Sequence, residues 1–113
     1  MGEFIYANFL IKVNPSNYLK IKNKIPSNVN ILAVSKGFKG QEIKTIQNLG
    51  QNDFGESKLQ EASEKQLILK ELKKIKWHFI GRLQSNKIRR IVQNFNYIHS
   101  VDSKLSILLP FYM

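Results

Sequence analysis

The sequence contains no cysteine among its 113 residues. Disulfide bonds and thiolate-ligated metal sites are therefore both excluded, and a cysteine-free composition suits a reducing cytoplasm. Histidine is also scarce. The chain has 2 histidines, His78 and His99, and they lie far apart in sequence. The short ligand spacing of a zinc site is not present, so the sequence predicts no metal centre.

Long apolar runs are absent as well. The amino-terminal segment MGEFIYANFLIKVNP has a short apolar patch, lacks a positively charged leader and carries Glu3. A membrane-spanning helix needs about 20 consecutive apolar residues, and a signal peptide needs a basic leader. We therefore expect a soluble, cytoplasmic protein with no membrane partner, in which residues 1–13 form an extension of unclear role.

Acidic residues are few relative to basic ones. The chain has 18 Lys and Arg against 8 Asp and Glu, which gives a formal net charge of +10. Lys and Arg that neutralise phosphates release counterions, so a nucleic-acid-binding module is one interpretation of this excess. The basic residues are spread along most of the chain, however, with the densest runs at 70–76 and 82–90. We favour a solvated basic surface over a dedicated nucleic-acid interface.

Strand-like and helix-like segments alternate along the chain. Segments typical of helices (15–25, 40–50, 57–75 and 85–95) alternate with segments typical of strands (31–35, 52–56, 76–81 and 97–101). The connections are short, as in βα units, and such crossovers require neighbouring strands to be parallel. We predict an α/β fold with about four parallel strands and alternating helices packed against them.

The run NILAVSK (30–36) ends on a lysine. Ile31 to Val34 carry no charge, as expected for a strand covered on both faces, and Lys36 stands directly before a glycine. By itself, Lys36 is explained as a solvated residue at a strand end. The alternative is a nucleophile that forms a Schiff base, which requires an amine without its extra proton, a state that burial favours. From the residue alone we favour the solvated strand-end lysine.

Four segments together resemble a known family. LAVSK (32–36), FGESKLQEA (54–62), WHFIGRLQSNK (77–87) and IHSVDS (98–103) stand in the order and spacing of the YggS/PROSC-type pyridoxal phosphate homeostasis proteins. The barrel of these proteins is similar to the N-terminal domain of alanine racemase. The resemblance implies a (β/α)8 (TIM-type) barrel, pyridoxal 5'-phosphate as cofactor, and a Schiff base on the lysine that ends the first predicted strand. By position, that lysine is Lys36.

The same resemblance implies a cofactor pocket at the carboxyl ends of the strands. By position, its candidate residues beside Lys36 are Ser57, His78, Gly81 and Ser100. Ser57 departs from the family, which usually has asparagine there, and serine offers one hydroxyl in place of an amide's paired donor and acceptor. From the residues alone, Ser57 is predicted to cap the helix at 57–75, and His78 is equally well explained by packing within the sheet.

A barrel of this type has about 250 residues and eight strands. We therefore interpret residues 14–113 as the N-terminal half of an alanine-racemase-like barrel, truncated before the strands that supply the family's phosphate contacts. The open edges of such a sheet offer a route to self-association. The resemblance implies a cofactor carrier for homeostasis that is non-catalytic or weakly catalytic. A pyridoxal-phosphate-dependent enzyme resembling an amino-acid racemase is the alternative.

Overall fold

Five parallel strands form one sheet in residues 3–7 and 15–99, the part of the chain that the computed structural model describes. The strands are β1 (Glu3–Ala7), β2 (Val29–Val34), β3 (Asp53–Glu56), β4 (Lys76–Phe79) and β5 (Tyr97–Ile98). They lie in chain order, and each pairs with its neighbour in parallel. Parallel pairing in chain order requires a crossover between every two strands, and the helices supply it.

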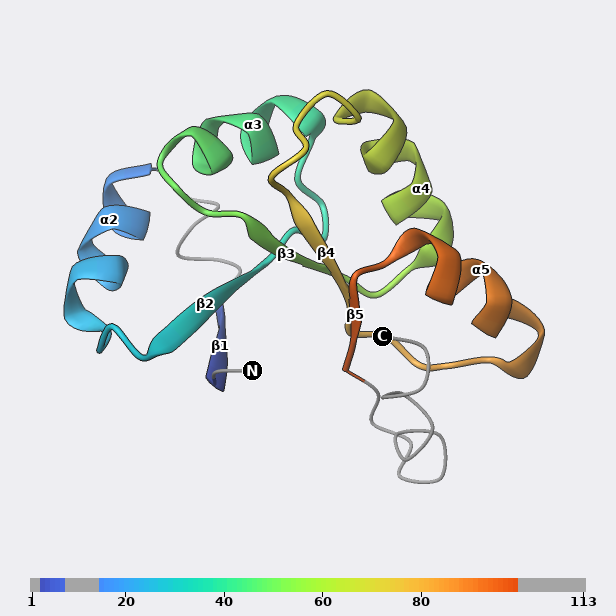
Figure 1. Ribbon diagram of the computed structural model, residues 1–113. Coiled ribbons are helices and arrows are strands. Elements are labelled where there is room, and N and C mark those ends of the chain that lie inside the picture. The colour runs from blue at the N-terminus through green and yellow to red at the C-terminus, as the bar shows by residue number, and fades with distance from the viewer. Residues whose placement is uncertain (1–2, 8–14, 100–113) are drawn as a thin grey trace.

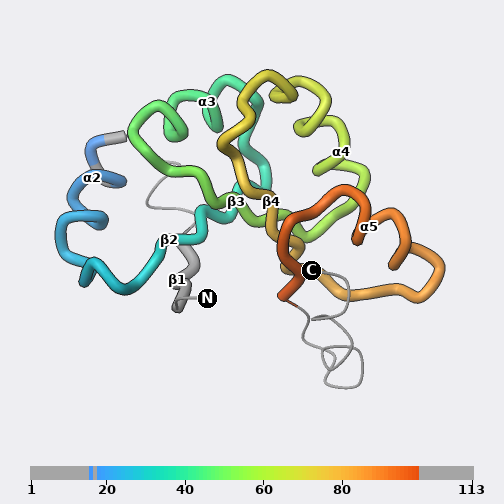
Figure 2. Tube along the Cα trace, viewed as in Figure 1, coloured from blue at the N-terminus to red at the C-terminus, as the bar shows by residue number. Residues whose placement is uncertain are grey.

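The helices all lie on the same side of this sheet. They are α2 (Pro15–Lys24), α3 (Gly40–Asn48), α4 (Leu59–Ile68) and α5 (Ile88–Asn94), the last preceded by a 3-10 turn, η1 (Ser85–Lys87). Figure 1 shows them following one another along an arc outside the strands, and the trace in Figure 2 shows the same winding. A doubly wound sheet would place helices on both faces and reverse its strand order. The arrangement is that of a partial (β/α) barrel, which confirms the predicted fold class.

The hydrophobic core lies between the sheet and these helices, in two clusters. One contains Ile31, Ala33 and Phe54 of the strands, packed against Tyr18 of α2 and Ile43 of α3. The other joins β4 and β5 to α4 and α5 and includes an edge-to-face contact between Phe79 and Phe95, with ring centroids 5.2 Å apart. Successive strand residues point to opposite faces. Buried residues occur at consecutive positions in β2, so this strand is covered on both sides, as predicted.

Side chains on the other face of the sheet, called here the inner face, point away from the helices. This face carries Leu32, Gly55, His78 and Ile80, since a Cβ built at Gly55 would meet Ile80 at 3.1 Å and Leu32 at 3.4 Å. Leu32 and His78 are both fully buried. Polar groups on this face must therefore find their hydrogen bonds within the protein.

Three local predictions differ from the structure. The segment 1–13 has a strand, β1, whose pairing with β2 runs from Glu3–Val29 to Ala7–Ala33. The helix expected at 57–75 ends at Ile68, because the chain then turns so that Leu69, Leu72 and Ile75 reach the first core cluster. Ser57 is not the cap of that helix, since the N-cap residue is Lys58 and makes no side-chain cap.

Candidate functional site

Lys36 lies at the tip of a turn that follows β2. The residue before it, Ser35, is fully buried, and its backbone N–H donates to the carbonyl of Gly55 at 3.0 Å. Gly37, with φ of 78°, takes a backbone conformation that side-chain-bearing residues rarely adopt. Phe38 then returns to the core and donates its N–H to Ser35 O at 2.9 Å. The turn is therefore anchored on both sides of Lys36.

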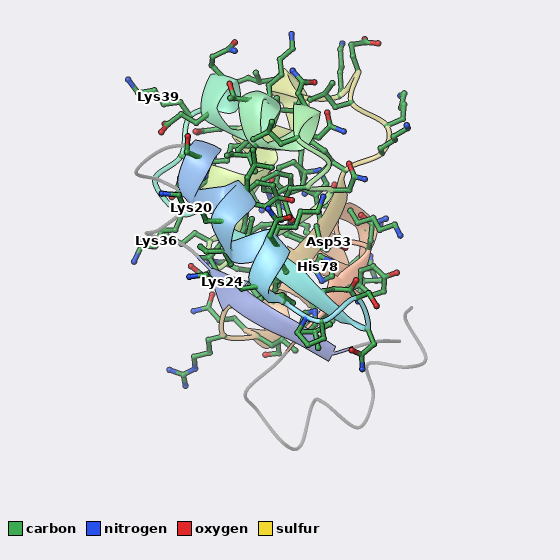
Figure 3. All side chains as sticks on the ribbon, turned by 90° about the vertical axis from the view of Figure 1, so that its left-hand side faces the viewer. Lys20, Lys24, Lys36, Lys39, Asp53 and His78 are labelled. Carbon is green, nitrogen blue, oxygen red and sulfur yellow. The ribbon has the colours of Figure 1, made fainter. Side chains whose placement is uncertain are left out.

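The side chain of Lys36 is exposed. In Figure 3 it lies at the margin of the molecule, on the same side as Lys39 and away from Asp53 and His78. The described residues therefore leave this side chain exposed, which differs from the burial expected for a Schiff-base lysine. The position itself agrees with the prediction, because the lysine stands at the carboxyl end of a strand.

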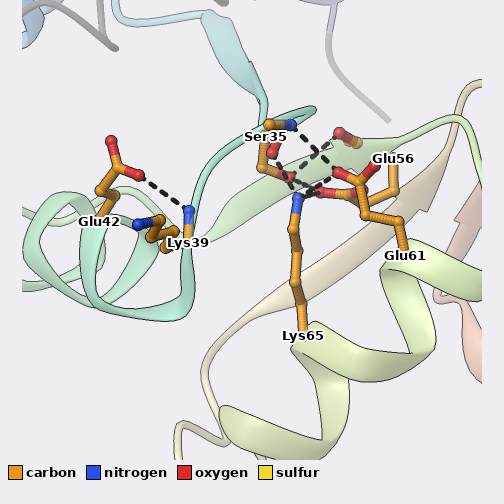
Figure 4. Close-up of polar contacts among 8 residues, drawn as sticks. Ser35, Lys39, Glu42, Glu56, Glu61 and Lys65 are labelled. Carbon is orange, nitrogen blue, oxygen red and sulfur yellow. Dashed lines mark hydrogen bonds and ion pairs between the residues drawn. The ribbon is translucent and has the colours of Figure 1, made fainter.

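A buried ammonium group lies beneath this turn. Lys65 of α4 is 6% exposed, and its Nζ donates to Ser35 O at 2.6 Å, to Glu56 Oε2 at 2.8 Å and to Glu61 Oε2 at 2.7 Å. Figure 4 shows this side chain reaching from the helix to the end of β2. Three acceptors match the three N–H donors of a lysine, so this amine is fully committed.

Two further hydrogen bonds complete the cluster of Ser35, Glu56, Glu61 and Lys65, called here the rim network. The Ser35 hydroxyl donates to the Glu56 carboxylate and lies 3.2 Å from Gly55 O. The backbone N–H of Gly37 donates to Glu61 Oε2 at 3.1 Å. The carbonyl before Lys36 and the amide after it are therefore both bound to the network.

The two carboxylates of the rim network have different environments. Burial raises the pKa of Glu56, and the hydrogen bonds from Lys65 and Ser35 oppose that shift. Hydrogen bonds from Lys65 and from the Gly37 amide lower the pKa of Glu61, which is partly exposed. Glu61 is thus a persistent anion beside the turn, whereas Glu56 depends on its buried cation.

Two of the predicted site residues lie side by side at the carboxyl ends of β3 and β4. Ser57 follows β3, and Gly81 follows β4 by two residues. A Cβ at Gly81 would lie 2.2 Å from the carbonyl oxygen of Ser57, which real Cβ atoms do not approach so closely. Gly81 is therefore required by a close approach of two backbone segments.

His78, the third candidate, lies on the inner face rather than on the rim. It is fully buried, and its ring nitrogens lie 2.8 Å from Asp53 Oδ1 and 2.8 Å from His99 Nε2. Its ring also stacks on Tyr97, with centroids 4.5 Å apart. Asp53 is the first residue of β3 and His99 follows β5, so the His78 ring bridges the amino-terminal end of one strand and the carboxyl-terminal end of another. Ser100, the fourth candidate, falls outside the described residues.

The contacts of His78 indicate how protons are arranged in this buried chain of side chains. If the Asp53 carboxylate accepts from Nε2–H of His78, then Nδ1 of His78 accepts from Nε2–H of His99. Burial, with a smaller effect from His78, lowers the pKa of His99. The contacts of His78 with Asp53, His99 and Tyr97 are with other protein side chains, which suits a structural role.

Two hollows lined by described residues do not include Lys36 in their lining. One, of about 490 Å³, lies at the amino-terminal ends of β2 and β3 and includes Tyr18, Lys22, Gln51 and Asp53 in its lining. Among the same residues, no helix is long and apolar enough to cross a membrane. Nor does any group of three His, Asp or Glu side chains in the described segments have an arrangement that could hold a metal ion.

Sequence reasoning missed Lys65 and gave Glu56 and Glu61 no specific role. The signal available in the sequence was the i, i+4 spacing of Glu61 and Lys65 on one helix, which ordinarily indicates a solvated surface pair. Burial of Lys65 depends on Glu56, which belongs to β3 and lies next to β2 only in the folded sheet.

Comparison with known proteins gives consistent matches, although no family model matches the chain. A pyridoxal phosphate homeostasis protein of Synechocystis sp. is 47% identical over 90 residues, which cover 80% of this chain and 41% of that protein. The Pseudomonas aeruginosa protein of the same name is 47% identical over 77 residues, covering 68% of this chain and 33% of the relative. The structure of Synechococcus elongatus PipY with pyridoxal phosphate bound superposes with a TM-score of 0.78 at 38% identity.

The chain is a partial member of the YggS/PROSC family. PipY covers 87% of this chain, whereas the chain covers 47% of PipY. This YggS/PROSC chain thus spans less than half the length of the relatives it matches. The PipY structure without pyridoxal phosphate gives the same TM-score of 0.78, so the likeness in fold holds for both forms of that neighbour.

Proposed function

We propose that this chain binds pyridoxal 5'-phosphate for cofactor homeostasis, with the cofactor held as a Schiff base on Lys36. One observation carries the proposal: an exposed lysine stands at the carboxyl end of β2, in a turn anchored on both sides. Relatives at 47% identity are pyridoxal phosphate homeostasis proteins, and a neighbour at 38% identity has the cofactor bound, which supports the choice of ligand.

The chemistry fits the residues present. In Schiff-base formation the lysine nitrogen attacks the aldehyde carbon, a C=N bond forms, and the aldehyde oxygen leaves as water. The reaction needs an amine that an aldehyde can reach, and exposed Lys36 meets this requirement. Lys65 does not, because it is buried and its nitrogen already donates to three acceptors. The proposal therefore assigns Schiff-base formation to Lys36 and not to Lys65.

The other predicted site residues receive different roles in this proposal. Ser57 and Gly81 form part of a wall at the carboxyl ends of β3 and β4, where a ligand attached to Lys36 would lie. His78 supports the sheet from its inner face and does not contact the cofactor, because both of its ring nitrogens bond to protein side chains. We further propose that residues 14–113 correspond to the first half of the relatives' barrel, with β1 as an added edge strand.

The test is a titration of the purified chain with pyridoxal 5'-phosphate, followed by visible absorbance. We expect a Schiff-base band in the parent chain and none in Lys36→Ala. Lys39→Ala is the matched control, because Lys39 is also exposed and lies three residues further along the chain. An equal band in the Lys36 variant, or equal losses in the two variants, would contradict the assignment.

The same samples separate a carrier from an enzyme. We propose binding without appreciable turnover, so addition of L-alanine to the loaded chain should leave the circular dichroism of the amino acid unchanged. Steady loss of that signal, dependent on Lys36, would instead support a racemase-like activity.

A further inference from the structure

Lys36 and Lys65 are two lysines joined through the backbone of a single turn. The Lys65 ammonium contacts Ser35 O, the carbonyl of the peptide unit before Lys36, at 2.6 Å. It also contacts Glu61, whose same oxygen accepts from the Gly37 amide, the peptide unit after Lys36. One buried cation therefore ties down the main chain on both sides of the exposed lysine (Figure 4).

The rim network is a rigid support because most of it is shielded from water. Glu56 is 1% exposed and Lys65 is 6% exposed. Charged groups in such surroundings hold their partners strongly, since solvent cannot replace a lost contact. The Ser35 hydroxyl and the Gly55 carbonyl connect the same network to β3, so the turn is fixed relative to the neighbouring strand.

A lysine side chain is long and flexible, so only the backbone of Lys36 can be held in place before a ligand binds. A ligand bound against the wall of Ser57 and Gly81 encounters the Lys36 amine often only if that backbone is held in place. Positioning of this kind raises the effective concentration of a reacting group, and displacement by about 1 Å can lower a rate about 100-fold.

We infer that Lys65 is a positioning residue for Lys36: it bonds the peptide unit before the reactive lysine directly and the one after it through Glu61, and so favours attack on the pyridoxal 5'-phosphate aldehyde. This inference rests on the proposed function. Lys65 itself forms no bond to the cofactor. Its removal leaves the Lys36 amine present and accessible but no longer preferred over other surface lysines.

The experiment measures site-resolved labelling in the full chain. The protein is incubated with pyridoxal 5'-phosphate, and borohydride then reduces the Schiff bases to stable secondary amines. Mass spectrometry of the peptides quantifies the labelling of each lysine. Lys39 is the internal reference, because it is exposed on the same molecule. We expect the ratio of Lys36 to Lys39 labelling to fall on the order of tenfold in Lys65→Met. Lys58→Met, on an exposed lysine just before the same helix, should leave the ratio unchanged.

A second variant decides the matter if Lys65→Met does not fold. Glu61→Ala removes the acceptor of the Gly37 amide while leaving the Lys65–Glu56 pair, and Glu64→Ala is its matched control on the exposed side of α4. We expect Glu61→Ala to lower the labelling ratio and to speed hydrogen exchange of the Gly37 amide, with neither change in Glu64→Ala.

The outcomes separate the two proposals. No preference for Lys36 in the parent chain would overturn the proposed function and this inference with it. Preference for Lys36 in the parent chain that persists unchanged in a folded Lys65→Met chain, or in Glu61→Ala if Lys65→Met is unfolded, would overturn the inference alone. Loss of the preference in a folded variant, with its control unaffected, supports both.

Discussion

Two buried polar clusters of one sheet differ in what they support. They are the rim network and the inner-face chain of Asp53, His78 and His99. Both join β3 to other elements through side chains that lie 2.7–2.8 Å from carboxylate or imidazole partners. The rim network bonds to backbone groups and so holds up a turn that presents an exposed lysine. The inner-face chain bonds side chain to side chain and presents no reactive group. A buried polar cluster therefore indicates a functional site when it supports an accessible reactive group. The residue types in the cluster do not indicate this by themselves.

The largest effect should come from removing the cation of the rim network. Lys65→Met leaves the Glu56 carboxylate buried without its partner, and breaking a buried ion pair in this way destabilises proteins by about 3–5 kcal/mol. Unfolding in urea measures the change. Adding Glu56→Leu to Lys65→Met should recover much of the loss, because the unpaired charge is then gone. No recovery in the double variant would show that the stability comes from other contacts of Lys65.

A smaller effect is expected at the wall beside the rim network. Gly81→Ala places a Cβ 2.2 Å from the Ser57 carbonyl oxygen, a backbone atom that cannot move aside without shifting β3. We expect a loss of about 1–3 kcal/mol in the free energy of unfolding. Gly40→Ala is the control, because its Cβ would meet the side chain of Ile68 at 3.0 Å. Ile68 is 69% exposed and can move, so the control should change stability by about 0.5 kcal/mol or less.

The smallest effect concerns the inner-face chain and appears as a pH dependence. Burial lowers the pKa of His99 below its ordinary value of 6.5, so the unfolded chain binds a proton there more readily than the folded chain. Stability from this group is therefore complete above pH 6.5 and is lost as the pH falls below that value. The groups that face His99 include His78, which also disfavours its protonation, and beyond it Asp53.

Urea unfolding of the parent chain and of His99→Gln between pH 7.5 and pH 5 measures that dependence. The parent chain should lose more stability on acidification than the variant, since glutamine does not titrate. A Lys39→Gln chain, altered at an exposed lysine, should follow the parent. If the parent and His99→Gln chains respond equally, the inner-face chain does not sense pH and the contrast with the rim network weakens.

Much of the fold could be predicted because each strand is a short apolar run between turn signals. The run at 31–34 is buried on both faces, and the segment at 40–48 has its apolar residues Ile43 and Ile46 on one helical face. β1 could not be predicted in this way, since it is defined by pairing with residues of β2 that lie 26 positions further along the chain, as in the pair of Glu3 and Val29. The end of α4 was missed because Leu69, Leu72 and Ile75 continue the apolar pattern while serving the core from a turn.

The candidate site could be predicted only in part for a similar reason. Lys36 follows from one local pattern, an apolar run that ends on a charge. Lys65 does not, because local spacing pairs it with Glu61 on a solvated surface, and only the folded sheet brings Glu56 and the Ser35 carbonyl to it. His78 was expected at the rim from its place near a strand end. Side-chain direction, which sends it to Asp53, was decided by the register of β3 and β4.

The parallel pairing of β1 with β2 has a consequence for how this curved sheet can close. At Ala33, β2 is aligned with Ala7 of β1 on one side and with Phe54 of β3 on the other. A strand arriving to complete a cylinder would therefore have to dock on the outer edge of β1 or displace it. A barrel closed on β1 would have one more strand than a barrel closed on β2. Its diameter would therefore be larger at the carboxyl end of β2, where Lys36 lies.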